Sequence, residues 1–190
     1  MKAMTRTVVG LVASSAIVVL LLLWVIVVYN RLVRRRNQVR AAWAQVDVQL
    51  KRRHDLIPNL VETVRGYTAH ESATVQAVVD ARARAVTATD TTQRTTAEGL
   101  LEQTLGRLLA VAEQYPELRA SRNFHALQSE LANTENKIAY ARQFYNGAVQ
   151  TYNTSVQSIP TNLVAGLTRF RTADLFGAGP DERDPVQVRF

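Results

Sequence analysis

The chain has 190 residues, a formal net charge of +7 and 47% hydrophobic residues, which suits one domain with appendages. It contains no cysteine, so disulfide frameworks, thiolate metal sites and cysteine nucleophiles are excluded. Glycine, proline and aromatic residues are few, and this composition favours helices over sheets.

The positive charge is concentrated in one stretch of the chain. Residues 29–54 contain eight basic residues and one acidic residue, whereas residues 55–190 contain thirteen basic and fifteen acidic residues. The larger part of the chain therefore lacks the basic footprint of a nucleic-acid-binding protein, and no aromatic residues are interleaved with the basic run from Arg31 to Arg40. We expect no nucleic-acid partner.

Residues 8–28 form an apolar run of twenty-one residues without a charge. A helix of that length rises about 1.5 Å per residue and spans a hydrocarbon core of about 30 Å. The rival interpretation is a cleaved signal peptide. However, the run is longer than the apolar region of an ordinary signal peptide, and no small-residue cleavage site follows the run. We predict an uncleaved transmembrane helix at residues 8–28, preceded by a short extracytoplasmic N-terminus at residues 1–7.

The flanks of the apolar run predict its orientation. Lys2 and Arg6 precede the run, and five arginines follow it between Arg31 and Arg40. The positive-inside rule then places the N-terminus outside and the C-terminal domain in the cytoplasm. The basic flank either signals topology alone or also attracts anionic lipid headgroups, so membrane lipids are expected partners of the anchor and its flank.

Beyond Arg36, apolar or small residues recur at steps of three and four, which is the pattern of an amphipathic helix. They are Val39, Trp43, Val46, Leu50, Ile57, Val61, Val64, Thr68, Val75 and Val78. Pro58 lacks the backbone donor that would bond to His54, and this permits two interpretations. Either the helix continues with a kink, or it ends near Arg53 and a second helix begins with Pro58 in its first turn and Asp55 as its cap. The unbroken phase favours a kink, whereas a compact bundle favours a turn.

The next helix is predicted from its start signal and its leucines. The threonine-rich residues 87–96 indicate a connection, and Thr95-x-x-Glu98 resembles a capping box that opens the helix. The buried stripe consists of Leu101, Leu105, Leu108 and Ala112, widened by Leu100 and Leu109. The helix is expected to end before Tyr115-Pro116, because a residue that precedes proline is pushed away from helical geometry.

The last long helix is predicted to begin between Pro116 and Asn123 and to run to about Ile159. Its apolar stripe consists of Phe124, Leu127, Leu131, Ile138, Tyr145, Val149, Tyr152 and Val156. A polar stripe lies beside it and consists of Glu135, Arg142, Asn146 and Asn153. We predict that these polar side chains are partly buried in a network that fixes the helix register, with energetic coupling between Glu135 and Arg142.

Two C-terminal segments complete the chain. Residues 161–176 contain several apolar residues and either cap the bundle or lie against the membrane surface. Residues 177–190 are rich in glycine, proline and charge, and we predict a disordered tail there.

Three stretches closely resemble the LemA family: YNRLVRRRNQVRAAWAQVDVQLKRRHDLIPNLVETVRGYTAHE, AEQYPELRASRNFHALQSELANTENKIAYARQFYNGAVQTYN and SIPTNLVAG. The resemblance covers roughly Tyr29 to Phe176, and VQLKRRHDLIPNLV, YPEL and ARQFYN are its most specific parts. It implies a bacterial membrane-anchored protein whose soluble part, residues 29–176, is an antiparallel helical bundle, and it supports a turn at Pro58. The family that it resembles has no established enzymatic activity, so the resemblance indicates a fold and not a reaction, and we expect no enzyme. The chain departs from the family pattern at Arg169, where a smaller residue is expected before Phe170.

The motifs of known active sites are missing from the sequence. It contains no Glu-x-x-His or His-Glu-x-x-His pattern, no phosphate-binding glycine loop and no Gly-x-Ser-x-Gly elbow. His54, His70 and His125 lie on separate segments, and a surface or capping role is the default for each. We therefore predict no catalytic residue, no cofactor site, no metal ligand and no small-molecule substrate.

These observations predict an all-α protein with an N-terminal transmembrane helix and a bundle of four long helices. We interpret it as an interaction or scaffold protein at the cytoplasmic face of a bacterial membrane, with a protein partner or self-association. The alternatives are direct membrane shaping or lipid binding, and an enzyme with an unrecognised site near the Glu135–Asn153 stripe or near His54 and Asp55.

Overall fold

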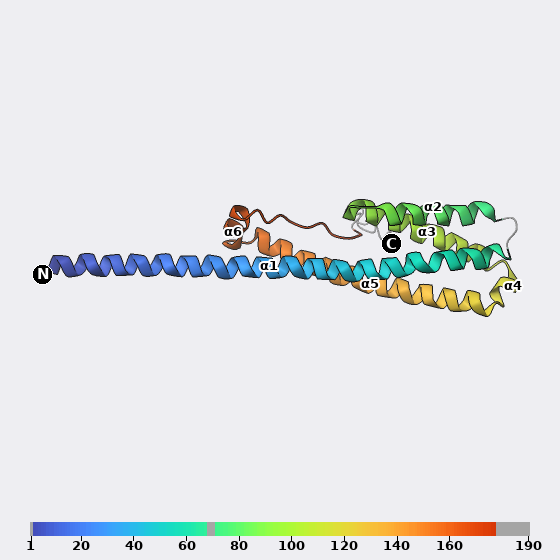
Figure 1. Ribbon diagram of the computed structural model, residues 1–190, viewed down its shortest axis with the longest axis horizontal. Coiled ribbons are helices and arrows are strands. Elements are labelled where there is room, and N and C mark those ends of the chain that lie inside the picture. Colours follow the sequence, from blue (N-terminus) through green and yellow to red (C-terminus); the bar gives the residue numbers. More distant parts are fainter. Residues whose placement is uncertain (1, 68–70, 178–190) are drawn as a thin grey trace, which may run out of the picture. The chain divides into compact units, whose positions relative to one another are not determined.

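The computed structural model describes residues 2–67 and 71–177, with side chains from Ser14 onwards. Six helices follow one another in this part of the chain (Figure 1): α1 (Lys2–Arg65), α2 (Ser72–Thr87), α3 (Thr91–Ala112), α4 (Pro116–Arg119), α5 (Arg122–Gln157) and α6 (Thr161–Leu167). These described residues contain no strand, which confirms the all-α class. The predicted disordered tail lies outside the described residues except for Gly177.

The chain divides into two compact units. The bundle unit consists of residues 41–147 and 174–190, and the span unit consists of residues 1–40 and 148–173. Helices α1 and α5 each contribute one part to each unit, so we describe the two units separately.

The bundle unit contains four long helical segments, contributed by α1, α2, α3 and α5, with the short α4 before α5 (Figure 1). Successive long segments run in opposite directions, so the predicted antiparallel bundle is confirmed. Its core combines residues of the predicted stripes with four residues that the stripes did not include, Leu60, Ala81, Ala85 and Leu118. The core residues from the predicted stripes are Ile57, Val61, Val64, Val75, Val78, Leu101, Leu105, Leu108, Ala112, Phe124 and Leu131, and all fifteen residues are less than 5% exposed.

The turn between the first two helices of the bundle lies at Gly66 and not at Pro58. Helix α1 continues through Pro58 to Arg65, so of the two interpretations left open at Pro58 the continuing helix is correct, and the turn that the family resemblance supported is wrong. Gly66 follows directly, and its N–H donates to the carbonyl of Glu62 at 3.2 Å, as is typical of a glycine after a helix C-terminus. The apolar stripe continues across this break, and it therefore did not reveal the turn.

The start of α3 also differs from the prediction. Asp90 is the N-cap, and its side chain accepts a hydrogen bond of 2.7 Å from the backbone N–H of Gln93. The expected capping box at Thr95 and Glu98 is therefore wrong. The threonines at the start of α3 are accommodated inside the helix, where Thr96 donates to the carbonyl of Thr92 at 3.1 Å.

The remaining boundaries follow the predictions. Helix α3 ends at Ala112, before Tyr115-Pro116, and α5 covers Arg122–Gln157 within the predicted limits. The predicted C-terminal apolar segment forms α6, after which the chain turns at Arg169 with a φ of 58°. This left-handed conformation explains why a smaller residue suits the position, because side chains with a Cβ disfavour it.

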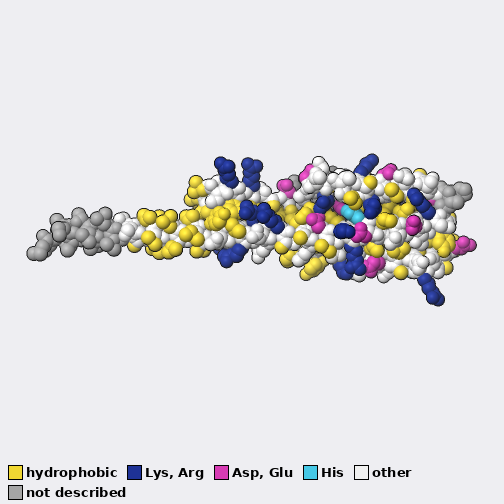
Figure 2. Space-filling model, in the orientation of Figure 1, with side chains coloured by type: hydrophobic (Ala, Val, Ile, Leu, Met, Phe, Trp, Pro, Cys, Tyr) yellow, Lys and Arg dark blue, Asp and Glu magenta, His cyan; other side chains and the backbone are white. Residues whose placement is uncertain are grey.

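The span unit has a small core of its own. Buried side chains come from α1, the end of α5, α6 and the segment after it: Leu32, Val39, Val149, Tyr152, Val164, Ala165 and Phe170. The apolar part of α1 that precedes this core is different, because Ile17 to Leu23 remain 54–65% exposed. Figure 2 shows hydrophobic side chains along this part of α1. It is the one helix among the described residues that is long and apolar enough to cross a membrane.

Candidate functional site

A buried group of charged side chains joins three helices of the bundle unit. Arg53 of α1 has a side chain that is only 2% exposed, and it donates to both carboxylate oxygens of Glu135 of α5, at 2.8 and 3.0 Å. It also donates to Glu98 of α3, whose side chain is 4% exposed. We name these three residues the Arg53 cluster. Because α1, α3 and α5 each supply one member, the cluster aligns the three helices.

The electrostatics of the cluster favour the charged forms of Arg53 and Glu98. Burial by itself disfavours a charged guanidinium, but the negative charges of Glu135 and Glu98 outweigh it and raise the pKa of Arg53. Burial likewise disfavours the charged form of Glu98, whereas the neighbouring His54 and Arg53 lower its pKa below its ordinary value. A carboxylate held in this way is a poor general acid, because it does not retain a proton near neutral pH.

A cleft of about 250 Å³ opens beside the cluster. His54 borders it, with Nε2 at 2.9 Å from Oε1 of Glu98, although the two atoms are not aligned for a hydrogen bond. Asp47 and Arg94 pair with each other at the same cleft. The full lining consists of Asp47, Leu50, Lys51, His54, Ala85, Val86, Arg94 and Glu98. The cleft contains no serine, threonine, tyrosine or cysteine that could act as a nucleophile.

The backbone carbonyl of His54 accepts a hydrogen bond from a side chain of another helix. Pro58 has no N–H, so the normal helical bond to the carbonyl of His54 cannot form. Nε of Arg82, from α2, donates to this carbonyl instead, at 2.7 Å. Arg82 therefore replaces the missing backbone donor, and this contact explains how α1 passes through Pro58 without ending.

The predicted polar stripe on α5 is partly buried, but its members do not form one network. Glu135 belongs to the Arg53 cluster, whereas the guanidinium of Arg142 lies 4.7 Å from the ring centre of Phe176. The contacts given for Glu135 and Arg142 therefore go to different residues, and the energetic coupling between the two side chains stays a prediction. Both polar side chains further along α5 bind the C-terminal segment instead.

The C-terminal segment is held on α5 by two asparagines and two tyrosines. In the bundle unit, the side chain of Asn146 makes two hydrogen bonds of 2.9 Å with the backbone of Phe176. In the span unit, Asn153 makes the same pair of bonds with Ala173, at 2.8 and 2.9 Å. The hydroxyls of Tyr145 and Tyr152 each donate at 2.8 Å, to the carbonyls of Asp174 and Arg171 respectively. This arrangement orders an extended segment that has few backbone partners of its own.

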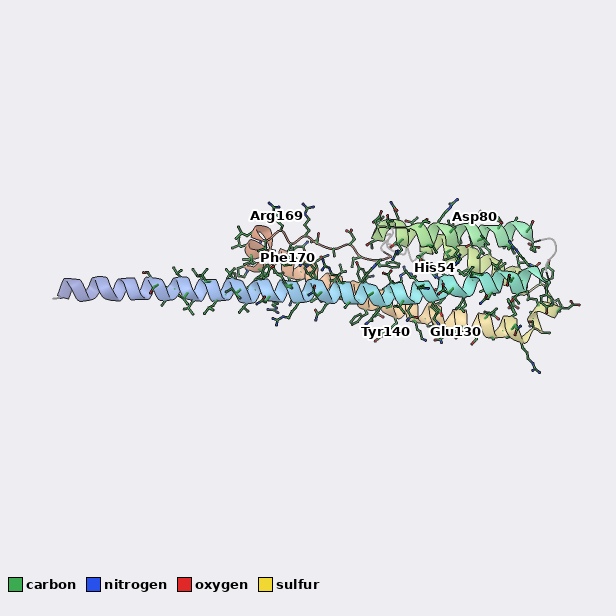
Figure 3. All side chains as sticks on the ribbon, viewed as in Figure 1. His54, Asp80, Glu130, Tyr140, Arg169 and Phe170 are labelled. Carbon is green, nitrogen blue, oxygen red and sulfur yellow. The ribbon has the colours of Figure 1, made fainter. Side chains whose placement is uncertain are left out.

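An open apolar groove runs between α1 and α5 in the bundle unit. It has a volume of about 570 Å³ and is lined by Ala44, Gln45, Val48, Gln49, Asn136, Lys137, Tyr140 and Ala141. Tyr140 is 74% exposed and Val48 is 62% exposed, and Figure 3 shows Tyr140 at this edge of the bundle. We name this surface the α1–α5 groove. The sequence predictions did not include it, although Val48 and Tyr140 are apolar residues outside the buried stripes.

The two histidines in the described part of the chain, His54 and His125, lie at different places in the bundle unit. His54 borders the cleft, His70 lies outside the described residues, and His125 is exposed beside Phe124 with ring centres 6.4 Å apart. Within residues 2–67 and 71–177, no group of three His, Asp or Glu side chains is arranged to hold a metal ion.

This chain is similar to one protein family and to several named bacterial proteins. The model of the LemA family matches residues 42–190. Magnetosome protein MamQ 2 of Paramagnetospirillum magneticum is 28% identical, over 83% of this chain and 68% of that protein. Magnetosome protein MamQ of Magnetospirillum gryphiswaldense is 25% identical with the same coverage, and protein LemA of Metamycoplasma hominis is 24% identical over 84% of this chain and 73% of that protein. None of these names states a reaction.

Proposed function

The chain belongs to the LemA family, and we propose that it is a membrane-anchored interaction protein whose α1–α5 groove binds an amphipathic helix of a partner protein. The single observation that carries this proposal is the groove itself. Its Tyr140 and Val48, at 74% and 62%, are the two most exposed large apolar side chains among the described residues of the bundle unit.

The anchor supports the first part of the proposal. The apolar residues of α1 from Ile17 to Leu23 are exposed to a degree that is unfavourable in water, and lipid chains would cover them. The charge bias across this helix, with Lys2 and Arg6 before it and five arginines after it, favours a cytoplasmic location for the bundle unit.

The form of the groove favours a helix as the occupant. Two neighbouring helices leave a shallow valley along their line of contact, and a third helix packs into such a valley at about 8–10 Å between axes. Val48, Tyr140 and Ala141 provide an apolar floor. Gln45, Gln49 and Asn136 provide hydrogen-bonding groups along the sides, as expected for a helix-in-groove interface. Lys137 adds a positive charge, so an acidic edge on the partner helix is the best complement.

The Arg53 cluster supports an interaction role more than a catalytic one. Arg53 donates to both Glu98 and Glu135, and these ion pairs between three helices account for the burial of the charges, although Nε of Arg53 and Oε1 of Glu98 have no hydrogen-bond partner among the described residues. The cluster would keep α1 and α5 in the register that forms the groove.

Photo-crosslinking tests the groove in the full-length protein in its native membrane. Tyr140 is replaced by p-benzoylphenylalanine, and Leu100 of α3, which is 37% exposed, provides the matched control position. We expect one crosslinked product at position 140 and none at position 100. The crosslinked partner peptide, identified by mass spectrometry, should carry apolar residues at steps of three and four.

A second variant makes the test specific. Val48→Asp introduces a charge into the floor of the groove without touching the buried core, because Val48 is 62% exposed. It should abolish the product at position 140 while the circular dichroism spectrum stays unchanged. A product of twice the chain mass of 21.2 kDa would identify a second copy as the occupant and would contradict a separate partner protein. Equal products at positions 140 and 100 would refute the groove.

A further inference from the structure

Helix α6 in the span unit has a second apolar face that no described part of this unit covers. Val164 and Ala165 are buried, with 3% and 1% exposure, and they attach the helix to the core of this unit. Leu163 and Leu167 lie one helical turn apart and are 65% and 86% exposed, and Ile159 just before the helix is 84% exposed. Three large aliphatic side chains on one short segment make an exposed patch that requires a partner.

The position of this patch along α1 is set by the segment that follows α6. Phe170 contacts Tyr29 of α1 edge-on, with ring centres 5.8 Å apart, and the guanidinium of Arg36 lies 4.8 Å from the centre of the Phe170 ring. Tyr29 directly follows the apolar run of residues 8–28. Figures 1 and 3 show α6 and Phe170 beside this part of α1. The segment is therefore attached where the apolar run gives way to arginines, which is the level of the lipid headgroups.

The charge of the span unit also fits a position at the lipid headgroups. Residues 1–40 and 148–173 contain no aspartate or glutamate, whereas they contain nine lysine and arginine residues. Arg169 and Arg171, just after α6, are exposed. Anionic lipid headgroups are the natural complement of an acid-free basic surface beside an apolar patch.

We propose that α6 lies in the membrane interface and inserts Ile159, Leu163 and Leu167 among the lipids, as a second membrane contact in addition to the spanning helix. This proposal rests on the membrane anchor of the proposed function. Lipid is the occupant that the position favours, because the membrane that covers the apolar run of α1 is already adjacent to α6. The contact gives the membrane-facing end of the protein a defined orientation, since a single spanning helix alone is free to rotate about its axis.

The absence of native cysteine allows single labels to test this contact. Full-length Leu167→Cys, labelled with an environment-sensitive nitrobenzoxadiazole dye, is reconstituted into vesicles of phosphatidylcholine and phosphatidylglycerol with or without brominated acyl chains. We expect the emission to shift to the blue and to be quenched by the brominated chains. Leu100→Cys in α3 provides the aqueous control, and Leu22→Cys in the apolar part of α1 reports the anchor.

The three labels separate the possible outcomes. If Leu22→Cys is quenched and Leu167→Cys behaves like Leu100→Cys, the anchor stands and the contact of α6 with lipid is refuted. If Leu22→Cys is not quenched either, the anchor of the proposed function fails. A blue shift at position 167 that depends on protein density and not on brominated lipid would assign the patch to a second copy and overturn the proposal. Replacing phosphatidylglycerol by phosphatidylcholine should reduce quenching at position 167 and leave it unchanged at position 22.

Discussion

The contact between Arg82 and the carbonyl of His54 makes a quantitative prediction about Pro58. Arg82→Met removes the donor but keeps a side chain of similar length, so the carbonyl of His54 is left without the bond of 2.7 Å. A partly buried carbonyl that loses its donor costs about 1–3 kcal/mol, and we expect the free energy of unfolding to fall by this amount. In a Pro58→Ala background, the restored backbone N–H at position 58 bonds to the same carbonyl, and Arg82→Met should cost much less.

The double-mutant cycle measures this difference directly. Urea unfolding of the full-length protein in detergent micelles is followed by the fluorescence of Trp43, in a Trp24→Phe background. Trp43 reports the bundle unit because its ring packs on Tyr145, with centres 5.0 Å apart. We expect a coupling energy of about 1 kcal/mol between positions 58 and 82, well above the additivity error of about 0.3–0.5 kcal/mol.

The matched control is Arg84→Met, two residues away on the same helix but exposed. It removes an arginine of α2 without removing the bond to His54, so it should change stability by less than about 0.5 kcal/mol in both backgrounds. The contradicting result is that Arg82→Met lowers the free energy of unfolding equally with proline and with alanine at position 58. That result would show that Arg82 does not replace the backbone donor, and the explanation of the uninterrupted helix would be wrong.

Three further predictions concern the buried polar groups. Glu98→Gln leaves Arg53 with one counter-charge and should lower the free energy of unfolding by on the order of 2 kcal/mol, measured by the same urea titration. The pKa of Glu98 in the folded protein lies below its ordinary value of 4.5, so its carboxylate contributes fully to stability above pH 4.5. This contribution is lost as the pH falls through the lowered pKa. In a pH series, the free energy of unfolding should therefore fall less on acidification in Glu98→Gln than in the wild type. Tyr152→Phe removes the 2.8 Å bond to the carbonyl of Arg171 and should increase amide hydrogen exchange at residues 170–173, with a change of about 1 kcal/mol in local opening. An unchanged exchange rate there would show that the hydroxyl does not hold the segment.

The sequence by itself determined the all-α class of this protein and the buried faces of its long helices. The spacing of Leu101, Leu105 and Leu108 predicted a buried face that the structure confirms, and Tyr115-Pro116 marked the end of α3 correctly. These features depend on residues that are neighbours in the chain, because a helix places positions three and four apart on one face. The apolar run in α1 was equally visible, since its length alone matches a membrane.

Only the tertiary structure showed which other helices and side chains each helix packs against. Pro58 does not end α1 because Arg82, twenty-four residues later, supplies the missing donor. Glu98, predicted as part of a cap, is buried against Arg53, because Asp90 already caps α3 and the fold brings a buried guanidinium to Glu98. Periodicity shows which face of a helix is buried, but it does not show which other helix covers that face. The α1–α5 groove depends on this choice of neighbours, and only the packed bundle makes it visible.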